Sequence, residues 1–177
     1  MPRHARAYRQ GDLDGLCGVY AVVNALQYLF GLKEDHCRTL FATLIKALHR
    51  SRRRPHHPIL WGMSFATLKR LIEAAQTCKV LDGAQTFQAR PLRLSRDQRN
   101  LPRLWSGLSQ ELTPTCVAVI GITGAADHWC VVYRVTAKTL WLLDSSGQTR
   151  IYRSRCTVRS TRTRYCLEAR EILLIKR

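Results

Sequence analysis

The segment GDLDGLCGVY at positions 11–20 contains the side chain best suited to covalent chemistry, Cys17. A glycine-containing loop precedes this cysteine and an apolar run follows it, which predicts that Cys17 lies in the first turn of a buried helix. Backbone N–H groups and the dipole at a helix start stabilise a thiolate and can hydrogen-bond an oxyanion. Gly15 and Gly18 are expected to leave space beside the sulfur. Cys17 is therefore the candidate nucleophile, although a lone cysteine at such a position can also serve packing alone.

Two strand-like segments further along the chain supply candidate partners for this nucleophile. His128 begins the apolar run in DHWCVVYRV at 127–135, and Asp144 ends the next run in LWLLDSSG at 140–147. On neighbouring strands, the carboxylate can accept a hydrogen bond from the imidazole, which fixes its tautomer and stabilises the imidazolium. Together these residues predict a Cys17–His128–Asp144 triad, with Asp127 and Asp14 as the next carboxylates to consider.

Strand register decides whether Asp144 can reach His128. A two-residue turn at Ala137 and Lys138 would point Asp144 away from the histidine, because a change of register by one residue moves a side chain to the opposite face. The triad therefore needs either a three-residue loop at 135–137 or a β-bulge. The turn residues alone do not decide between these arrangements.

Hydrophobic periodicity indicates helices first and strands second, which predicts an α+β fold. Helices are expected at about 17–30, 34–49, 64–77 and 97–112, the last interrupted by Pro102 and Gly107. Strands are expected at about 86–94, 116–122, 129–135, 140–143, 150–158 and 165–175, with one packed and one basic face in 150–158. Residues 1–177 are predicted to form a single domain, with a helical half at about 1–112 and an antiparallel sheet half at about 113–177.

Composition narrows the class of protein. Apolar residues make up 46% of the 177 residues, which suffices for one packed core. The seven cysteines are odd in number and show no Cys-x-x-Cys spacing, so neither a disulfide framework nor a structural zinc site is expected. The sequence has no apolar stretch of the length of a membrane span and no signal-peptide pattern, which predicts a cytoplasmic protein or one exported by a route that needs no such signal.

The chain is strongly basic, with 29 Lys and Arg against 12 Asp and Glu and a net charge of +17. Such a surface attracts polyanions, either nucleic acid or an acidic protein. The candidate surface comprises Arg90, Arg93, Arg96, Arg99, Arg103 and the basic region from Arg150 onward. The loop at 51–58, which includes His56 and His57, is also basic. A noncatalytic nucleic-acid-binding domain is therefore the alternative to an enzyme.

The segments GDLDGLCGVYAVVNAL, DHWCVVYRV and LWLLDSSG resemble the cysteine, histidine and aspartate boxes of papain-like cysteine peptidases. Among papain-like peptidases, these segments most resemble those of the compact bacterial branch that includes the leader-removing peptidases of bacteriocin exporters. The resemblance implies a papain-like fold, in which a helical lobe carries Cys17 and an antiparallel sheet carries His128 and Asp144. It further implies cleavage of a peptide or isopeptide bond in a protein or peptide substrate, without cofactor or metal. An acyltransferase or deamidase would use the same triad and stays open.

The resemblance also implies a residue that helps to bind the oxyanion. The family usually has a glutamine shortly before the cysteine, and here Gln10 lies seven residues upstream. Asp12 and Asp14 lie nearer to Cys17, but an ionised carboxylate has no hydrogen to donate. Gln10 is therefore the oxyanion candidate, and Asp14 is expected to order the loop or cap the helix.

Overall fold

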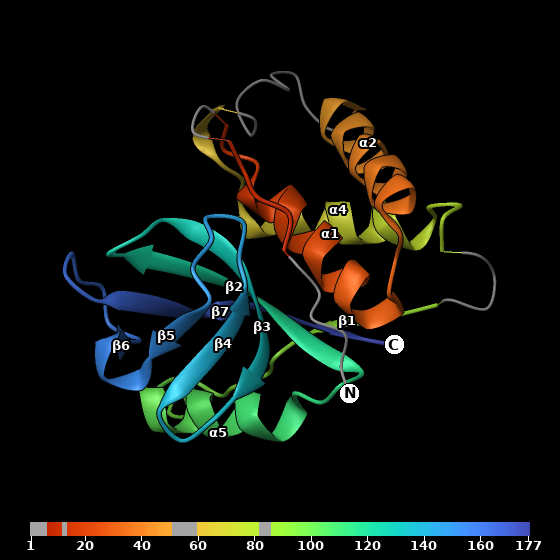
Figure 1. Cartoon of the computed structure of the whole chain (residues 1–177). Coiled ribbons are helices and arrows are strands. Elements are labelled where there is room, and N and C mark those ends of the chain that lie inside the picture. Colours follow the sequence, from red (N-terminus) through yellow and green to blue (C-terminus); the bar gives the residue numbers. More distant parts are fainter. Residues whose placement is uncertain (1–6, 12–13, 51–59, 82–85) are drawn as a thin grey trace.

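The computed structural model describes residues 7–11, 14–50, 60–81 and 86–177. N-terminal helices pack on a largely antiparallel C-terminal sheet, so the predicted α+β class is confirmed (Figure 1). The basic loop expected at 51–58, with His56 and His57, lies outside the described residues. None of the helices in the described part of the chain combines the length and the apolar character needed to cross a bilayer.

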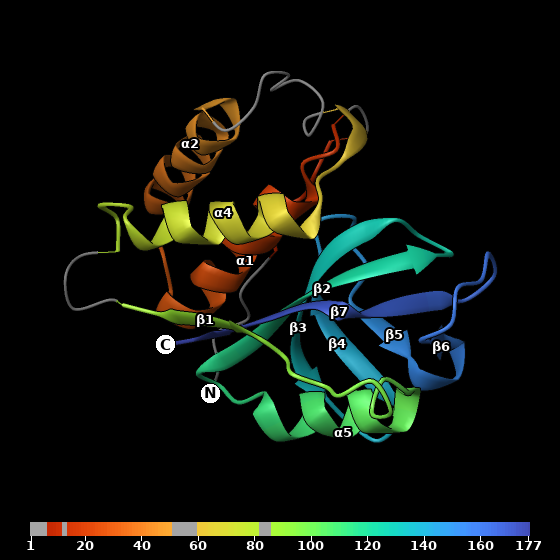
Figure 2. The ribbon, with the colours of Figure 1, turned by 180° about the vertical axis from the view of Figure 1, so that it is seen from behind.

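The first layer contains the helices α1 (Cys17–Phe30), α2 (Glu34–Arg50) and α4 (Phe65–Gln76). Helix α1 ends where Gly31 adopts a φ of 65°, a left-handed conformation that glycine adopts without steric cost. Ser64 caps α4 by accepting a hydrogen bond from the Thr67 N–H at 3.4 Å. Helix α1 contacts α2 and α4 as well as the sheet, which explains why it is apolar on nearly every side (Figures 1 and 2).

The sheet has seven strands. Six of them follow the spatial order β1 (Gln88–Pro91), β7 (Tyr165–Lys176), β2 (Cys116–Gly124), β3 (His128–Val135), β4 (Thr139–Leu143) and β5 (Arg150–Tyr152). These neighbours pair antiparallel, whereas the short β6 (Cys156–Thr157) pairs parallel to β7. Strand β2 is buried on both faces, with Val117 and Val119 in the core shared with the helices and Ala118 and Ile120 in a second core. Its uninterrupted apolar sequence reflects this double burial.

Helix α5 (Leu101–Glu111) covers the opposite face of the sheet from α1 (Figures 1 and 2). Asn100 caps it by accepting a hydrogen bond from the Arg103 N–H at 3.0 Å, so the helix begins later than residue 97. Pro102 does not interrupt α5, because it lies in the first turn, where its missing N–H has no intrahelical partner to lose. Both β1 and α5 therefore pack with the sheet, although they belong to the first 112 residues.

The expectation of one continuous strand at 150–158 is wrong. Strand β5 ends at Tyr152, a 3₁₀ turn η1 (Arg153–Arg155) follows, and β6 begins at Cys156. Ile151 and Cys156 are both buried in the core that faces α5. They are five residues apart, so a continuous strand would point them to opposite faces. The 3₁₀ turn changes this phase and lets both side chains enter one core.

Candidate functional site

Cys17 is the first residue of α1, as the sequence predicted. The N-cap residue, Leu16, provides no side-chain hydrogen bond, so the helix start remains available to other groups. The space beside the cysteine is filled by another segment of the chain. A Cβ at Gly18 would lie 2.5 Å from the Met63 sulfur, and a Cβ at Gly15 would overlap the backbone of Gly62. The two glycines thus allow residues 62–63 to pack against the nucleophile loop.

Asp14 orders the loop that leads to Cys17. Its Oδ1 accepts a hydrogen bond from the Leu16 N–H at 3.0 Å, and its Oδ2 accepts one from the Gly11 N–H at 3.1 Å. Both oxygens are thus engaged with the backbone of this loop. The structure therefore gives Asp14 the loop-ordering position expected from the sequence.

His128 and Asp144 meet at the same end of two adjacent strands. His128 is the first residue of β3, and Asp144 directly follows the last residue of β4. The His128 Nε2 lies 2.5 Å from the Asp144 Oδ1, and the two side chains are 15% and 2% exposed. At this separation and burial the pair is a strong, charge-assisted hydrogen bond.

A β-bulge places both residues on one face of the sheet. The chain turns at Ala137 and Lys138, and the turn is closed by a 2.9 Å hydrogen bond from the Thr136 N–H to the Thr139 carbonyl. The strand pairing then shifts by one residue around Tyr133, from Arg134↔Trp141 to Val131↔Leu143. Continued by one residue, the second register sets Asp144 opposite Cys130, two residues from His128 and on the same face. Of the two arrangements that the triad required, the structure has the bulge.

The turn after β4 holds the Asp144 carboxylate. Its Oδ2 accepts hydrogen bonds from the Ser146 hydroxyl and from the Gln148 N–H, the latter at 3.2 Å. Sequence reasoning did not identify these two residues, although the polar turn SSGQ directly after Asp144 carried the signal. Asp127, the alternative carboxylate, lines the same cleft as His128, but the ring nitrogen Nε2 is bonded to Asp144.

Electrostatics favours the charged forms of both members of the pair. Burial alone would lower the pKa of His128, but hydrogen bonds to Asp144 and Cys17 and the charges of both groups outweigh it and raise this pKa to about 10. Burial would raise the pKa of Asp144, yet the hydrogen bond and charge of His128, with the bonds from Ser146 and Gln148, lower it. An imidazolium–carboxylate pair is therefore the resting form at neutral pH.

Cys17 and His128 line the same cleft, and the Cys17 thiol is near enough to contribute to the raised pKa of His128. Because Nε2 is bonded to Asp144, Nδ1 is the nitrogen left for the thiol. The Cys17 residue is 6% exposed, and its sulfur also approaches the Gly15 carbonyl at 3.9 Å. A helix start, a strand start and a strand end thus bring the three predicted residues together.

The remaining cysteines differ from Cys17 in their surroundings. All are free and buried, and no other cysteine lines the cleft that Cys17 shares with His128 in the described residues. Burial raises the pKa of five of these thiols, namely Cys37, Cys116, Cys130, Cys156 and Cys166. A high pKa suppresses the thiolate that alkylation requires, so these five are structural thiols with little reactivity.

Gln10 reaches the site through an N-terminal segment that is fixed at two points. Asn24, buried in α1, accepts a 2.7 Å hydrogen bond from the Tyr8 N–H and donates one to the Tyr8 carbonyl. The Gln10 N–H donates to the Ser145 carbonyl at 3.0 Å. The Gln10 side chain lines the cleft, where its amide nitrogen donates to the Asp14 carbonyl. Asn24 is a positioning residue that sequence reasoning missed, since a polar residue in an apolar helix was its only signal.

Cys17 and His128 open into a cleft of about 520 Å³. Trp129 forms part of its wall, stacks on Phe65 with ring centroids 6.1 Å apart, and donates its indole N–H to the Met63 carbonyl at 2.9 Å. Leu60 and Trp61 also line the cleft and are 54% and 78% exposed. The cleft therefore offers apolar contacts beside a polar reaction centre.

Comparison of the chain with protein-family models, curated proteins and solved structures found no match. A function for this protein is therefore inferred from the site itself. A thiol at a helix start, an imidazole in the same cleft and a carboxylate bonded to one ring nitrogen suit acyl chemistry through a covalent intermediate.

Proposed function

We propose that this protein is a papain-like thiol hydrolase that cleaves a peptide or isopeptide bond in a protein or peptide substrate. The observation that carries the proposal is that Cys17 and His128 share one cleft, while the 2.5 Å bond from His128 to the buried Asp144 orients the imidazole. The chemistry needs no cofactor or metal.

Acylation begins from the ion pair in which His128 holds the proton of Cys17 and the sulfur is a thiolate. The raised pKa of His128 favours this pair, because the imidazolium is stabilised by the Asp144 carboxylate. The thiolate attacks the substrate carbonyl carbon, and a tetrahedral oxyanion forms. His128 then protonates the leaving amine, the C–N bond breaks, and the acyl group remains on Cys17 as a thioester.

Deacylation reverses the proton route. Water gives a proton to the now neutral His128 and attacks the thioester carbon, which releases a carboxylic acid and restores the Cys17 thiolate beside the His128 imidazolium. The sum of both halves is the addition of one water across the amide bond. An amine in place of this water would make the same site an acyltransferase, and a substrate side-chain amide would make it a deamidase.

The oxyanion needs donors at the start of α1. The backbone N–H groups of the first helical turn have no intrahelical acceptors, and they point toward a group bound at Cys17. The amide of Gln10 provides a second donor if substrate displaces it from the Asp14 carbonyl, where it is held in the free protein. In the free protein, the Gln10 amide is therefore held near the position where it would bind the oxyanion.

Selective alkylation tests the nucleophile. Wild-type protein is treated with limiting iodoacetamide between about pH 6 and pH 9, and each cysteine is quantified by peptide mass spectrometry. We expect Cys17 to react fastest, and His128→Gln to slow its labelling near neutral pH. The buried Cys130 is the internal reference within the same molecules. Uniform labelling of the cysteines would rule out the proposed nucleophile.

Substrate cleavage tests the reaction class. Protein extracts and peptide libraries are incubated with wild type and Cys17→Ala, and new termini are identified by mass spectrometry, with and without an added amine. New carboxyl termini that depend on Cys17 support hydrolysis, and amine adducts support acyl transfer. Cys78→Ser, which changes a buried cysteine that bonds to Thr43 and does not line the cleft, is the matched control. Salt-dependent nucleic-acid binding without any thiol reactivity would favour the noncatalytic alternative.

A further inference from the structure

The outer part of the sheet carries a row of arginine and aromatic side chains that the proposed reaction does not use. Arg134 on β3 pairs with Trp141 on β4, and Trp141 pairs with Arg150 on β5. Directly opposed residues share a face, and Tyr152 joins the same face two residues after Arg150. We call the surface formed by Arg134, Trp141, Arg150 and Tyr152 the β3–β5 face.

These side chains are accessible, and Arg150 contacts both aromatic rings. Arg134 and Arg150 are exposed, Tyr152 is 48% exposed, and Trp141 is half-buried. The Arg150 guanidinium lies 5.4 Å from the centre of the Tyr152 ring and 5.9 Å from that of Trp141. This arrangement presents flat π and guanidinium surfaces beside positive charge.

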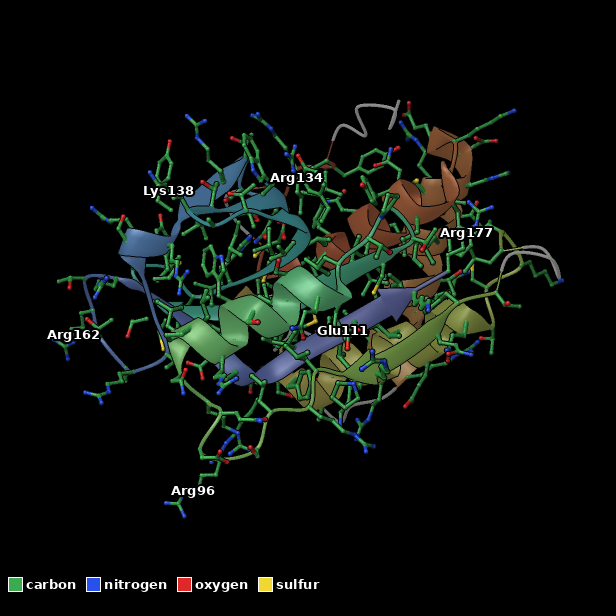
Figure 3. All side chains as sticks on the ribbon, turned by 90° about the horizontal axis from the view of Figure 1, so that it is seen from below. Arg96, Glu111, Arg134, Lys138, Arg162 and Arg177 are labelled. Atoms are coloured by element: carbon green, nitrogen blue, oxygen red, sulfur yellow. The ribbon has the colours of Figure 1, made fainter. Side chains whose placement is uncertain are left out.

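In the part of the chain that the structure describes, no acidic side chain forms an ion pair with the arginines of this face. Residues 128–167 contain eight Lys and Arg but one acid, Asp144, which is buried against His128. Within the described residues, the lysine and arginine ion pairs are Arg38–Glu34 and Arg90–Glu111, and neither involves this face. The other predicted basic surface differs, because Glu111 pairs with Arg90 there. Figure 3 shows Arg134 and Lys138 along one edge of the molecule, on the side opposite Arg96.

We propose that the β3–β5 face binds single-stranded nucleic acid. Phosphates would pair with Arg134 and Arg150, while bases stack on Tyr152 and on the Arg150 guanidinium, as every base offers a π-face. The row crosses three strands, about 10 Å between the outer two, so it suits a short unpaired stretch. An acidic peptide would pair with the same charges, but its carboxylate side chains offer no π-face to stack on the aromatic rings.

Fluorescence anisotropy with labelled oligo-U and oligo-dT of about 12 nucleotides tests this proposal. Wild type is expected to bind with strong salt dependence. The Arg134→Gln/Arg150→Gln double variant should flatten the slope of log K against log salt by about 1.4, since single strands release about 0.7 counterions per phosphate contact. Tyr152→Ala should weaken binding by about 5- to 100-fold, and Tyr152→Phe should retain it.

Matched controls separate this face from general charge. Lys46→Gln/Arg50→Gln removes two exposed cations from α2 and should leave the affinity unchanged. Cys17→Ala should also leave it unchanged, so the binding proposal and the proposed hydrolase can fail independently. Equal losses in both double variants, or full competition by poly-glutamate together with an inert Tyr152→Ala, would overturn the proposal. Far-ultraviolet circular dichroism confirms that each variant is folded.

Discussion

Replacement of Asp144 by asparagine removes the charge of this side chain and nearly preserves its shape. The pKa of His128 is about 10 against an ordinary 6.5, which corresponds to on the order of 5 kcal/mol in favour of the imidazolium. The hydrogen bond and the charge of Asp144 are two of the causes of this rise, whereas burial opposes it. An opposite charge at this distance shifts a pKa by about 1–3 units, so Asp144→Asn should lower the pKa of His128 by that amount.

Asparagine also changes the hydrogen-bond pattern, because it has a single oxygen. In wild type, one carboxylate oxygen faces His128 and the other accepts from the Gln148 N–H. A backbone N–H can only donate, so the asparagine oxygen is expected to stay on Gln148 and to turn its NH₂ toward the ring. The ring proton then moves to Nδ1, which can no longer accept the Cys17 proton.

Asp144→Ala should therefore retain more activity than Asp144→Asn. Alanine leaves the Nε2 side of the ring open to a cavity of about 150 Å³ that His128, Ser146 and Gln148 line. A water there can accept the Nε2–H and preserve the productive tautomer. We expect Asp144→Asn to lose about 10⁴-fold in turnover, as expected for a ring held in the wrong tautomer, and Asp144→Ala to lose less. Cys17→Ala should abolish turnover.

The assay is an NMR titration of the His128 ring C–H signals, assigned by comparison with His128→Gln, combined with Cys17-dependent turnover. A wild-type His128 that titrates near its ordinary value of 6.5 would contradict the ion pair. Identical titrations in wild type and Asp144→Asn would show that Asp144 does not raise the pKa. Higher turnover in Asp144→Asn than in Asp144→Ala would refute the tautomer argument.

Three further perturbations test other parts of the site. The raised pKa of His128 stabilises the folded protein fully below pH 6.5, and this contribution is lost as pH rises through about 10. Urea titrations should show the loss in wild type and in the exposed control His49→Gln, but not in His128→Gln. Gln10→Ala and Gln10→Glu should both lower kcat by about 100-fold or more if Gln10 is an oxyanion donor, while a change in KM alone would contradict this role. Gly15→Ala should lower the melting temperature and the labelling of Cys17 because its Cβ overlaps the Gly62 backbone, whereas Gly107→Ala, with its nearest neighbours 3.8 Å away, should not.

Local chemistry was sufficient to predict the elements that carry the site. Helix α1 begins at Cys17 and ends at Gly31 because the apolar run and the left-handed glycine are both encoded within a short window. The same holds for the Ser64 cap of α4 and for the strand that begins at His128. These signals depend on residues a few positions apart, so no tertiary information is needed to read them.

Features that depend on distant parts of the chain were not predictable in this way. The position of α5 on the opposite face follows from how its Leu104 and Leu108 fit the second core, which its own periodicity does not specify. The 3₁₀ turn at 153–155 appears only when Ile151 and Cys156 must enter that same core. Asn24 acquires its role from the Tyr8 backbone, sixteen residues away.

The bulge around Tyr133 shows that a one-residue shift in strand pairing decides whether the candidate site can form. With the register of Val135↔Leu140 continued, Asp144 would lie opposite Val131 and face the helical core, away from His128. One extra residue in β3 reverses this and brings a carboxylate to the imidazole. No residue type at 133 demands a bulge, since Tyr133 fits a regular strand and packs its ring against Tyr28 at 5.4 Å. The pairing of the whole hairpin, with apolar residues on both faces, selects the bulge, and the candidate site depends on that choice.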